Sequence, residues 1–373
     1  MVICALPGKL ATSSSQGRKL LKHLIWILLL PALGALATAQ DNPRWPAEKA
    51  AQWYAGQPWL VGCDFIPSTA INQLEMWQGD TYDAQTIDRE LGYAEGLGFN
   101  IVRVYLHLLV WEADADAFFE RMDHFLEIAD RHHIATMFVF FDDCWNPDPQ
   151  PGKQPEPKPG LHNSGWVQCP GAAGVTDITR FPAYEKYVRE TLTRFKDDPR
   201  IILWDLYNEP GNSGHLEKSL PLLKKVFEWA QAVRPSQPIS AGVWNNSRDF
   251  ARLNAFQLNN SDVITFHNYD DVASMKAAID SLRSYGRPLI CTEYMRRPVS
   301  NFQSHLPLLH QEKVGAINWG LVNGKTQTIY PWETWQKPYE KEPEIWFHDI
   351  FEKDGTPYKP AETALIRSLS GVE

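Results

Sequence analysis

Short runs of consecutive apolar residues recur along the chain, and within each run the apolar positions are continuous rather than alternating. Strands that are buried on both faces have this pattern, because neither side of such a strand meets water. The runs predict eight strands, at residues 59–63, 100–106, 134–141, 201–206, 238–243, 263–266, 288–291 and 315–318.

The segments between these runs carry apolar residues at helical spacing instead. Phe118, Met122 and Phe125 form one such stripe, and Asp271 stands where a helix N-cap is expected. Further stripes contain Ile87, Leu91 and Ala94, then Tyr184, Val188 and Leu192, then Leu220, Leu223 and Phe227, then Met275, Ile279 and Leu282. Alternating strands and helices predict a parallel sheet with right-handed crossovers, and eight such units favour one closed (β/α)8 barrel, a TIM barrel of the α/β class. No GxGxxG motif follows the first predicted strand, which argues against a dinucleotide-binding fold.

Two long segments interrupt this alternation, at residues 143–180 after the third strand and 321–358 after the eighth. Both are rich in Pro and Trp, and loops of this length inside a compact domain are usually functional. Because both follow strands, we expect both on the carboxyl-terminal rim of the barrel, where the active sites of such barrels lie.

The first 39 residues have the features of a secretory signal peptide. Basic residues precede an apolar stretch at 24–35, and Ala-Thr-Ala at 37–39 fits a cleavage site before Gln40. The apolar stretch is short for a membrane span, although a retained anchor is the alternative. We expect an exported protein, periplasmic or extracellular, with one catalytic domain at 40–373 and no membrane contact after signal removal.

The composition of 44% hydrophobic and 22% charged residues is that of a globular protein. A net charge of −9 without a basic run makes nucleic acid a poor partner and is compatible with a neutral substrate. Four cysteines follow the signal, without metal-binding spacing: we expect Cys63 and Cys291 to be buried, whereas Cys144 and Cys169 bracket a long loop and could form a bridge after export.

Polar residues gather where the predicted strands end, and in a barrel these positions converge on one rim. They include Arg103, His107, Asp142, Asp143, Asn208, Glu209, Trp244, His267, Tyr269, Glu293 and Trp319. Glu209 and Glu293 are the central pair, because glycoside hydrolysis needs one carboxyl group as a proton donor and a second at the anomeric carbon. Either residue alone could equally be a structural ion-pair partner.

Two stretches resemble motifs of the retaining (β/α)8 glycoside hydrolases, the clan that includes the family 5 cellulases and mannanases. They are Trp-Asp-Leu-Tyr-Asn-Glu-Pro at residues 204–210 and Cys-Thr-Glu-Tyr at residues 291–294. The resemblance covers the mature chain in strand order. It implies Glu209 as acid/base and Glu293 as nucleophile, with Asn208 on the sugar 2-hydroxyl and Arg103 keeping the nucleophile ionised. It further implies that Tyr269 lies near the nucleophile, His267 near the acid/base and Trp319 beneath the sugar.

The third strand departs from the clan, because Asp-Asp-Cys-Trp at 142–145 stands where many family 5 members have a histidine. His107 could take the place of that histidine. Further candidates for sugar contact, chosen because they follow strands or lie in the two long segments, are Asp143, Trp145, His162, Trp244 and Asn323. Tryptophan is abundant, with 15 residues, and we expect at least two of those on the rim loops to line a groove.

These features predict a retaining enzyme that cleaves a β-linked poly- or oligosaccharide, similar to an endo-β-1,4-glucanase, mannanase or xylanase, without a cofactor. An exo-acting β-glycosidase, of the β-mannosidase or β-galactosidase type, is the first alternative, and a non-catalytic carbohydrate-binding barrel is the second. A catalytic metal is disfavoured, because no HxH motif follows the first strand and the adjacent His132 and His133 cannot readily share one ion.

Overall fold

A computed structural model describes residues 44–372, so the predicted signal peptide at 1–39 lies outside the described residues. All eight predicted strands are present, most of them shifted by one or two residues at their ends. They are β1 (Val61–Asp64), β2 (Ile101–Tyr105), β3 (Ala135–Asp142), β4 (Ile201–Asn208), β5 (Ile239–Ser240), β6 (Ile264–His267), β7 (Leu289–Glu293) and β8 (Gly315–Trp319).

The strands form one parallel sheet in the order β5-β4-β3-β2-β1-β8-β7-β6. Its two edges meet through an isolated parallel bridge between Val243 and Phe266, where the His267 amide donates to the Val243 carbonyl at 2.9 Å. The result is a nearly closed (β/α)8 barrel, as the alternation of strands and helices predicts.

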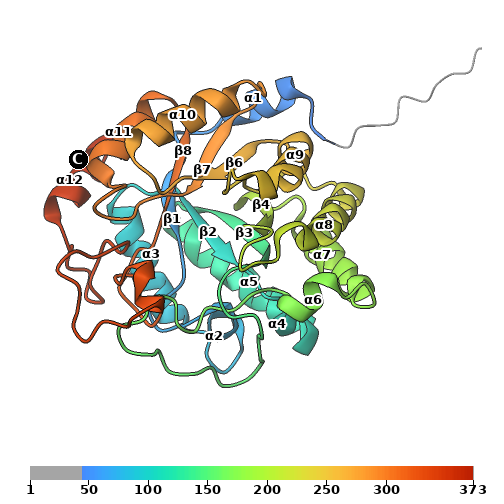
Figure 1. The fold of residues 1–373 in the computed structure, drawn as a ribbon, viewed down its shortest axis with the longest axis horizontal. Helices are drawn as coiled ribbons and strands as arrows, with labels where there is room; N and C mark the ends of the chain where they lie inside the picture. The colour runs from blue at the N-terminus through green and yellow to red at the C-terminus, as the bar shows by residue number, and fades with distance from the viewer. Residues whose placement is uncertain (1–43, 373) are drawn as a thin grey trace, which may run out of the picture. The chain divides into compact units, whose positions relative to one another are not determined.

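Helices surround the strands (Figure 1). They are α1 (Ala47–Ala55), α2 (Gln73–Trp77), α3 (Ala84–Gly96), α4 (Leu108–Ala113), α5 (Ala115–Arg131), α6 (Ala172–Thr176), α7 (Phe181–Phe195), α8 (Leu220–Val233), α9 (Ala251–Asn260), α10 (Val272–Arg283), α11 (Phe302–Gln311) and α12 (Pro360–Ser370), with short 3₁₀ turns η1 (Leu216–Ser219), η2 (Arg248–Phe250) and η3 (Trp332–Trp335). The predicted apolar stripes are buried against the barrel, and Asp271 caps α10 by accepting from the Ser274 amide at 2.9 Å. Within residues 44–372, no helix is long and apolar enough to cross a membrane.

The inside of the barrel changes from apolar to polar along the strand direction. Alternate residues of a strand point to the same side, so Ile101, Arg103 and Tyr105 of β2 occupy successive levels. Ile101 packs with Met137, Leu203, Val263, Ile290 and Ile317 in an apolar cluster. Two residues further along β2, the fully buried Arg103 begins a polar layer beneath the carboxyl-terminal rim.

The two long segments are joined to each other on that rim. The Asn163 amide donates to the Thr326 carbonyl at 2.8 Å, and the Tyr339 amide donates to the Gly160 carbonyl at 3.0 Å. Because β2 and β1 lie between β3 and β8 in the sheet, the joined segments bridge this side of the rim, where the green and orange-red loops approach each other in Figure 1.

All four cysteines that the structure describes are free and buried. Cys63 and Cys291 are packed in the core as expected. The possible Cys144–Cys169 bridge is not formed: the Cys169 sulfur accepts from the Leu108 amide at 3.4 Å, and the Cys144 thiol lies 3.3 Å from Glu209.

Candidate active site

Glu209 and Glu293 line one cavity of about 620 Å³ on the carboxyl-terminal rim. Glu293 is the last residue of β7, and Glu209 directly follows β4. One carboxylate oxygen of each lies within 4.8 Å of the other, and of a ring nitrogen of His267. Glu209 has a φ of 44°, a left-handed conformation that is uncommon outside glycine and that often marks a functional position.

Three donors converge on the Glu293 carboxylate. Arg103 Nη1 and the Tyr105 hydroxyl donate to Oε1 at 2.8 and 2.9 Å, and the Tyr269 hydroxyl donates to Oε2 at 2.8 Å. Burial acts to raise the pKa of Glu293, but the charges of His267 and Arg103 and these hydrogen bonds outweigh burial and lower the pKa below its ordinary value. Glu293 is therefore held as a carboxylate.

Arg103 is itself fixed by several acceptors. Its Nη2 donates to Asp205 at 2.8 Å and to Asn208 Oδ1 at 2.6 Å, and its Nη1 donates to Asp64 at 2.8 Å. Burial raises the pKa of Asp64 well above its ordinary value, although Arg103 opposes this rise. A proton that enters this network therefore binds to the carboxylate of Asp64 rather than to that of Glu293.

Glu209 has a different environment, in which its contacts are a histidine ring, a thiol and a side-chain amide. His267 Nδ1 lies 2.8 Å from Oε1, while the Cys144 thiol donates to Oε2 at 3.3 Å and Asn212 also donates to Oε2. Burial raises the pKa of Cys144 well above its ordinary value, so its sulfur remains a thiol and keeps its proton for this contact. No guanidinium contacts Glu209 among the described residues, in contrast to Glu293.

Indole rings form much of the cavity surface. Trp145, Trp166, Trp244, Trp319 and Trp332 line it, so the expectation of at least two tryptophans at a groove is met. The ring of Trp319 is held edge-on by Trp166 and Tyr105, with centroids 5.4 and 5.9 Å away. Rigid indole faces of this kind can cover the apolar face of a pyranose.

Most of the other candidates from the sequence also line the cavity. These are His162, Asn208, His267 and Tyr269. Arg103 lies beneath them and reaches the cavity only through Glu293 and Asn208.

Three candidates do not face the cavity. His107 is wholly buried as the N-cap of α4, accepting from the Leu109 amide at 3.2 Å, and burial lowers its pKa to about 4. Asp143 accepts from the Tyr207 hydroxyl and the Gly211 amide, both at 2.7 Å, and so holds the loop that follows Glu209. Asn323 donates its amide to the Phe351 carbonyl within the 321–358 segment. His107 does not replace the strand-3 histidine.

Several residues around the pair were given no role from the sequence, although Asp142 was noted at the end of its strand. Tyr105 was detectable, because it lies two positions after Arg103 and therefore on the same side of β2. Asp142 accepts from Asn208 Nδ2 at 2.9 Å, and burial raises its pKa to about 7. Asn212 and His348 come from loops, and no periodic pattern in the sequence marks them.

Glu209, His267 and Glu293 have the spacing of a metal-binding group within residues 44–372. The electrostatics oppose this use, because Arg103 already places a positive charge 2.8 Å from Glu293. A divalent cation would have to bind against that charge.

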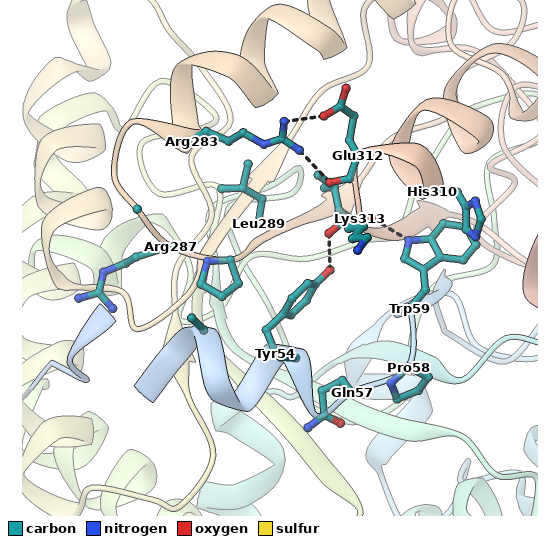
Figure 2. A pocket seen from close by; sticks show the side chains of 15 residues that line it. Tyr54, Gln57, Pro58, Trp59, Arg283, Arg287, Leu289, His310, Glu312 and Lys313 are labelled. Carbon is teal, nitrogen blue, oxygen red and sulfur yellow. Dashed lines mark hydrogen bonds and ion pairs between the residues drawn. The ribbon is translucent and has the colours of Figure 1, made fainter. Parts of the chain in front are cut away.

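A second cavity, of about 830 Å³, lies at the other end of the barrel (Figure 2). It is bounded by α1 and by the residues that precede β7 and β8. Two of its charged groups form an ion pair, Arg283 with Glu312 at 2.5 Å, and the Tyr54 hydroxyl donates to the backbone carbonyl of Lys313 at 3.0 Å. Glu312 is the one carboxylate among its described lining residues, so we place the chemistry at the carboxyl-terminal cavity.

A parallel barrel with two facing glutamates and an indole-lined cavity on its carboxyl-terminal rim defines a glycoside hydrolase by class. The sequence matches the family Cellulase (glycosyl hydrolase family 5) over residues 66–334, which is more than half of the chain. The chain therefore belongs to glycosyl hydrolase family 5.

Solved structures share the fold at low sequence identity. An exo-β-1,4-mannosidase from Opitutaceae bacterium strain TAV5 superposes with a TM-score of 0.60 at 16% identity, covering 84% of this chain and 60% of that one. An endo-β-1,4-mannanase from Thermotoga petrophila has a TM-score of 0.55 at 15% identity, covering 85% and 77%. A β-glucuronidase from Pongo abelii is 26% identical over 137 residues, which are 34% of this chain and only 20% of that protein.

Proposed function

We propose that the chain hydrolyses β-linked, uncharged glycosides with retention of anomeric configuration. Glu293 attacks the anomeric carbon and forms a glycosyl ester, while Glu209 protonates the oxygen of the departing group. Glu209 then takes a proton from a water molecule, whose oxygen attacks the same carbon and releases Glu293. No cofactor takes part in either step.

The different surroundings of the two glutamates support this division of roles. A nucleophile must be ionised, and the arginine and two tyrosine hydroxyls at Glu293 favour its charged form. An acid/base must exchange a proton in each half-reaction, and Glu209 contacts a histidine rather than a fixed cation. One carboxylate oxygen of each glutamate lies within 4.8 Å of one of the other, which favours the short separation of retaining enzymes over the roughly 6.5–9.5 Å of inverting enzymes.

The charge of the cavity favours a neutral sugar. Its described lining includes Glu209, Asp270 and Glu293 but neither lysine nor arginine. Burial lowers the pKa of His162 to about 4 and that of His348 well below its ordinary value, so both are uncharged at neutral pH. A uronic acid would find neither a lysine nor an arginine for its carboxylate in this lining, so we expect mannosides or glucosides rather than glucuronides to be cleaved.

The sequence favours an endo-acting enzyme, but one observation favours the exo-acting alternative. The joined segments at 143–180 and 321–358 stand on one side of the cavity, whereas a long glycan needs a cleft that is open at both ends. Export of the enzyme remains part of the proposal, on the basis of the sequence at 1–39.

The anomeric form of the first product tests the mechanism. Proton NMR of a nitrophenyl β-mannoside or β-glucoside reaction should show the β-sugar first, followed by slow mutarotation. Initial release of the α-sugar would refute the retaining mechanism. The nitrophenyl β-glucuronide should not be hydrolysed measurably. Glu293→Gln should abolish hydrolysis of the mannoside and the glucoside, which would also exclude a binding barrel.

A further inference from the structure

The two joined segments place three polar side chains on the cavity side of their junction. His162 and Asn163 come from the segment after β3, and His348 comes from the segment after β8. All three are nearly fully buried, yet all three line the cavity. The junction beside them is held by the Thr334 hydroxyl, which accepts from the His162 amide at 3.1 Å.

Both histidines present a hydrogen-bond acceptor. His162 Nδ1 lies 2.8 Å from the Tyr330 carbonyl, and His348 Nδ1 is bonded to the Met295 carbonyl at 2.5 Å. A carbonyl can only accept, so Nδ1 carries the proton in each ring. Because both rings are neutral, the Nε2 atoms have free lone pairs, and such atoms can accept from sugar hydroxyls.

Asn163 and His348 have buried polar atoms without a partner among the described residues. These atoms are Nδ2 and Oδ1 of Asn163 and Nε2 of His348. Asn163 also has a φ of 44°, in the left-handed region. Buried polar groups are nearly always hydrogen-bonded, so three such atoms at one cavity wall point to a ligand with several hydroxyl groups.

The wall adjoins the sugar that the nucleophile would hold. The ring of His348 lies 5.7 Å from that of Tyr269, whose hydroxyl donates to Glu293. Tyr269 also packs edge-on against Trp332 at 5.1 Å, in the same 321–358 segment. These contacts place His348 beside the nucleophile, and His162, whose ring lies 5.4 Å from that of His348, adjoins it. Because the nucleophile holds the glycone, we take this wall to face the glycone side of the scissile bond.

From this arrangement we infer that His162, Asn163 and His348 form an end wall that binds the hydroxyls of a terminal, uncharged sugar and prevents the glycan from extending past it. The enzyme then removes one sugar at a time from the non-reducing end. This inference rests on the proposed retaining function, and it adds the residues that recognise the glycone.

Product analysis tests the wall. Manno-oligosaccharides and cello-oligosaccharides of two to six units, labelled at the reducing end, should each lose one unlabelled monosaccharide per cleavage. Early appearance of labelled fragments that are two or more units shorter, without the intermediate length, would overturn the inference.

Two matched substitutions test the residues. Asparagine reproduces the Nδ1 position of histidine but lacks Nε2, so His348→Asn should keep the bond to Met295 and lose the acceptor. The Oε1 atom of glutamine can accept at about the position of the histidine Nε2 atom, so His348→Gln should restore part of the activity. We expect kcat/KM for the aryl glycoside to fall roughly 10- to 100-fold in His348→Asn and in Asn163→Ala, mainly through KM. The exposed control substitutions His124→Asn and Asn259→Ala should leave it unchanged.

Monodeoxy aryl glycosides identify the hydroxyl that is bound. The wild type should discriminate against at least one deoxy sugar, modified at C3, C4 or C6, and His348→Asn or Asn163→Ala should remove that discrimination. Equal discrimination in the wild type and in both variants would overturn the wall. Labelling of Glu293 by a 2-deoxy-2-fluoro glycosyl fluoride tests the proposed function separately: a labelled enzyme that cleaves internally contradicts the wall alone.

Discussion

Replacing Tyr269 with phenylalanine removes one of the three donors to the Glu293 carboxylate and keeps the ring that packs against Trp332. The lost bond is 2.8 Å long, buried, and made to a charged acceptor. Hydrogen bonds to charged groups contribute roughly 1.5–3 kcal/mol. At 1.36 kcal/mol for each pKa unit, the pKa of Glu293 should rise by about one to two units.

The sign of the effect follows from the role of Glu293. Only the carboxylate attacks, so activity falls as the pH drops through the pKa of Glu293 in the free enzyme. A higher pKa therefore moves the acid limb of kcat/KM to higher pH by about one to two units. The assay is a pH profile of kcat/KM with a nitrophenyl glycoside.

Tyr294 offers a matched control, because its buried hydroxyl has no hydrogen-bond partner in the described structure. Tyr294→Phe should leave the acid limb where it is in the wild type. If Tyr269→Phe also left the acid limb in place, these hydrogen bonds would not be what keeps Glu293 ionised.

Three further predictions concern the acid/base and the stability of the fold. Glu209→Ala should lower kcat on poor leaving groups by roughly 10²- to 10⁴-fold, and azide should restore turnover while yielding a β-glycosyl azide; an α-azide would contradict retention. Burial raises the pKa of Asp349 to about 7, so its contribution to stability is complete below the unfolded pKa near 3.8 and is lost as the pH rises through about 7. The melting temperature of Asp349→Asn, relative to that of the wild type, should therefore rise between pH 4 and 8. A difference in melting temperature that stays constant over this range would refute the prediction. Glu362→Gln leaves the buried Arg297 without its anionic partner and should cost about 3–5 kcal/mol in urea unfolding, whereas Asp280→Asn, in an exposed pair with Lys276, should cost less than about 1 kcal/mol.

The barrel was predictable because its signal is repeated eight times. Strands buried on both faces leave continuous apolar runs, and each helix between them leaves a stripe such as Phe118, Met122 and Phe125. Strand ends also mark the rim, which is why the positions of Glu209 and Glu293 could be assigned to one cavity before any coordinates.

The direction of each rim side chain was less predictable. Asp142 and Asp143 are consecutive, so one points into the barrel toward Asn208 and the other points away toward Tyr207. The sequence analysis chose Asp143 for sugar contact. In the structure Asp143 instead holds the loop after Glu209. His107 was chosen for its position after β2, but its ring is used to cap the next helix.

Contacts between distant loops could not be read from the sequence at all. His162 and His348 lie 186 positions apart, and their rings meet at 5.4 Å only because the segments after β3 and β8 are hydrogen-bonded to each other. Proline, glycine and tryptophan in these segments indicate long functional loops, but no periodicity specifies which residues of one loop meet the other.

The central claim is that Glu293 forms a covalent bond with the sugar while Glu209 transfers the proton. Incubation with a 2-deoxy-2-fluoro glycosyl fluoride, followed by proteolysis and mass spectrometry, tests it most directly. We expect one glycosyl adduct, carried by the peptide that contains residues 291–294 and located on Glu293. An adduct on Glu209 or on any other residue, or an intact enzyme mass during measurable turnover of the reagent, would contradict it.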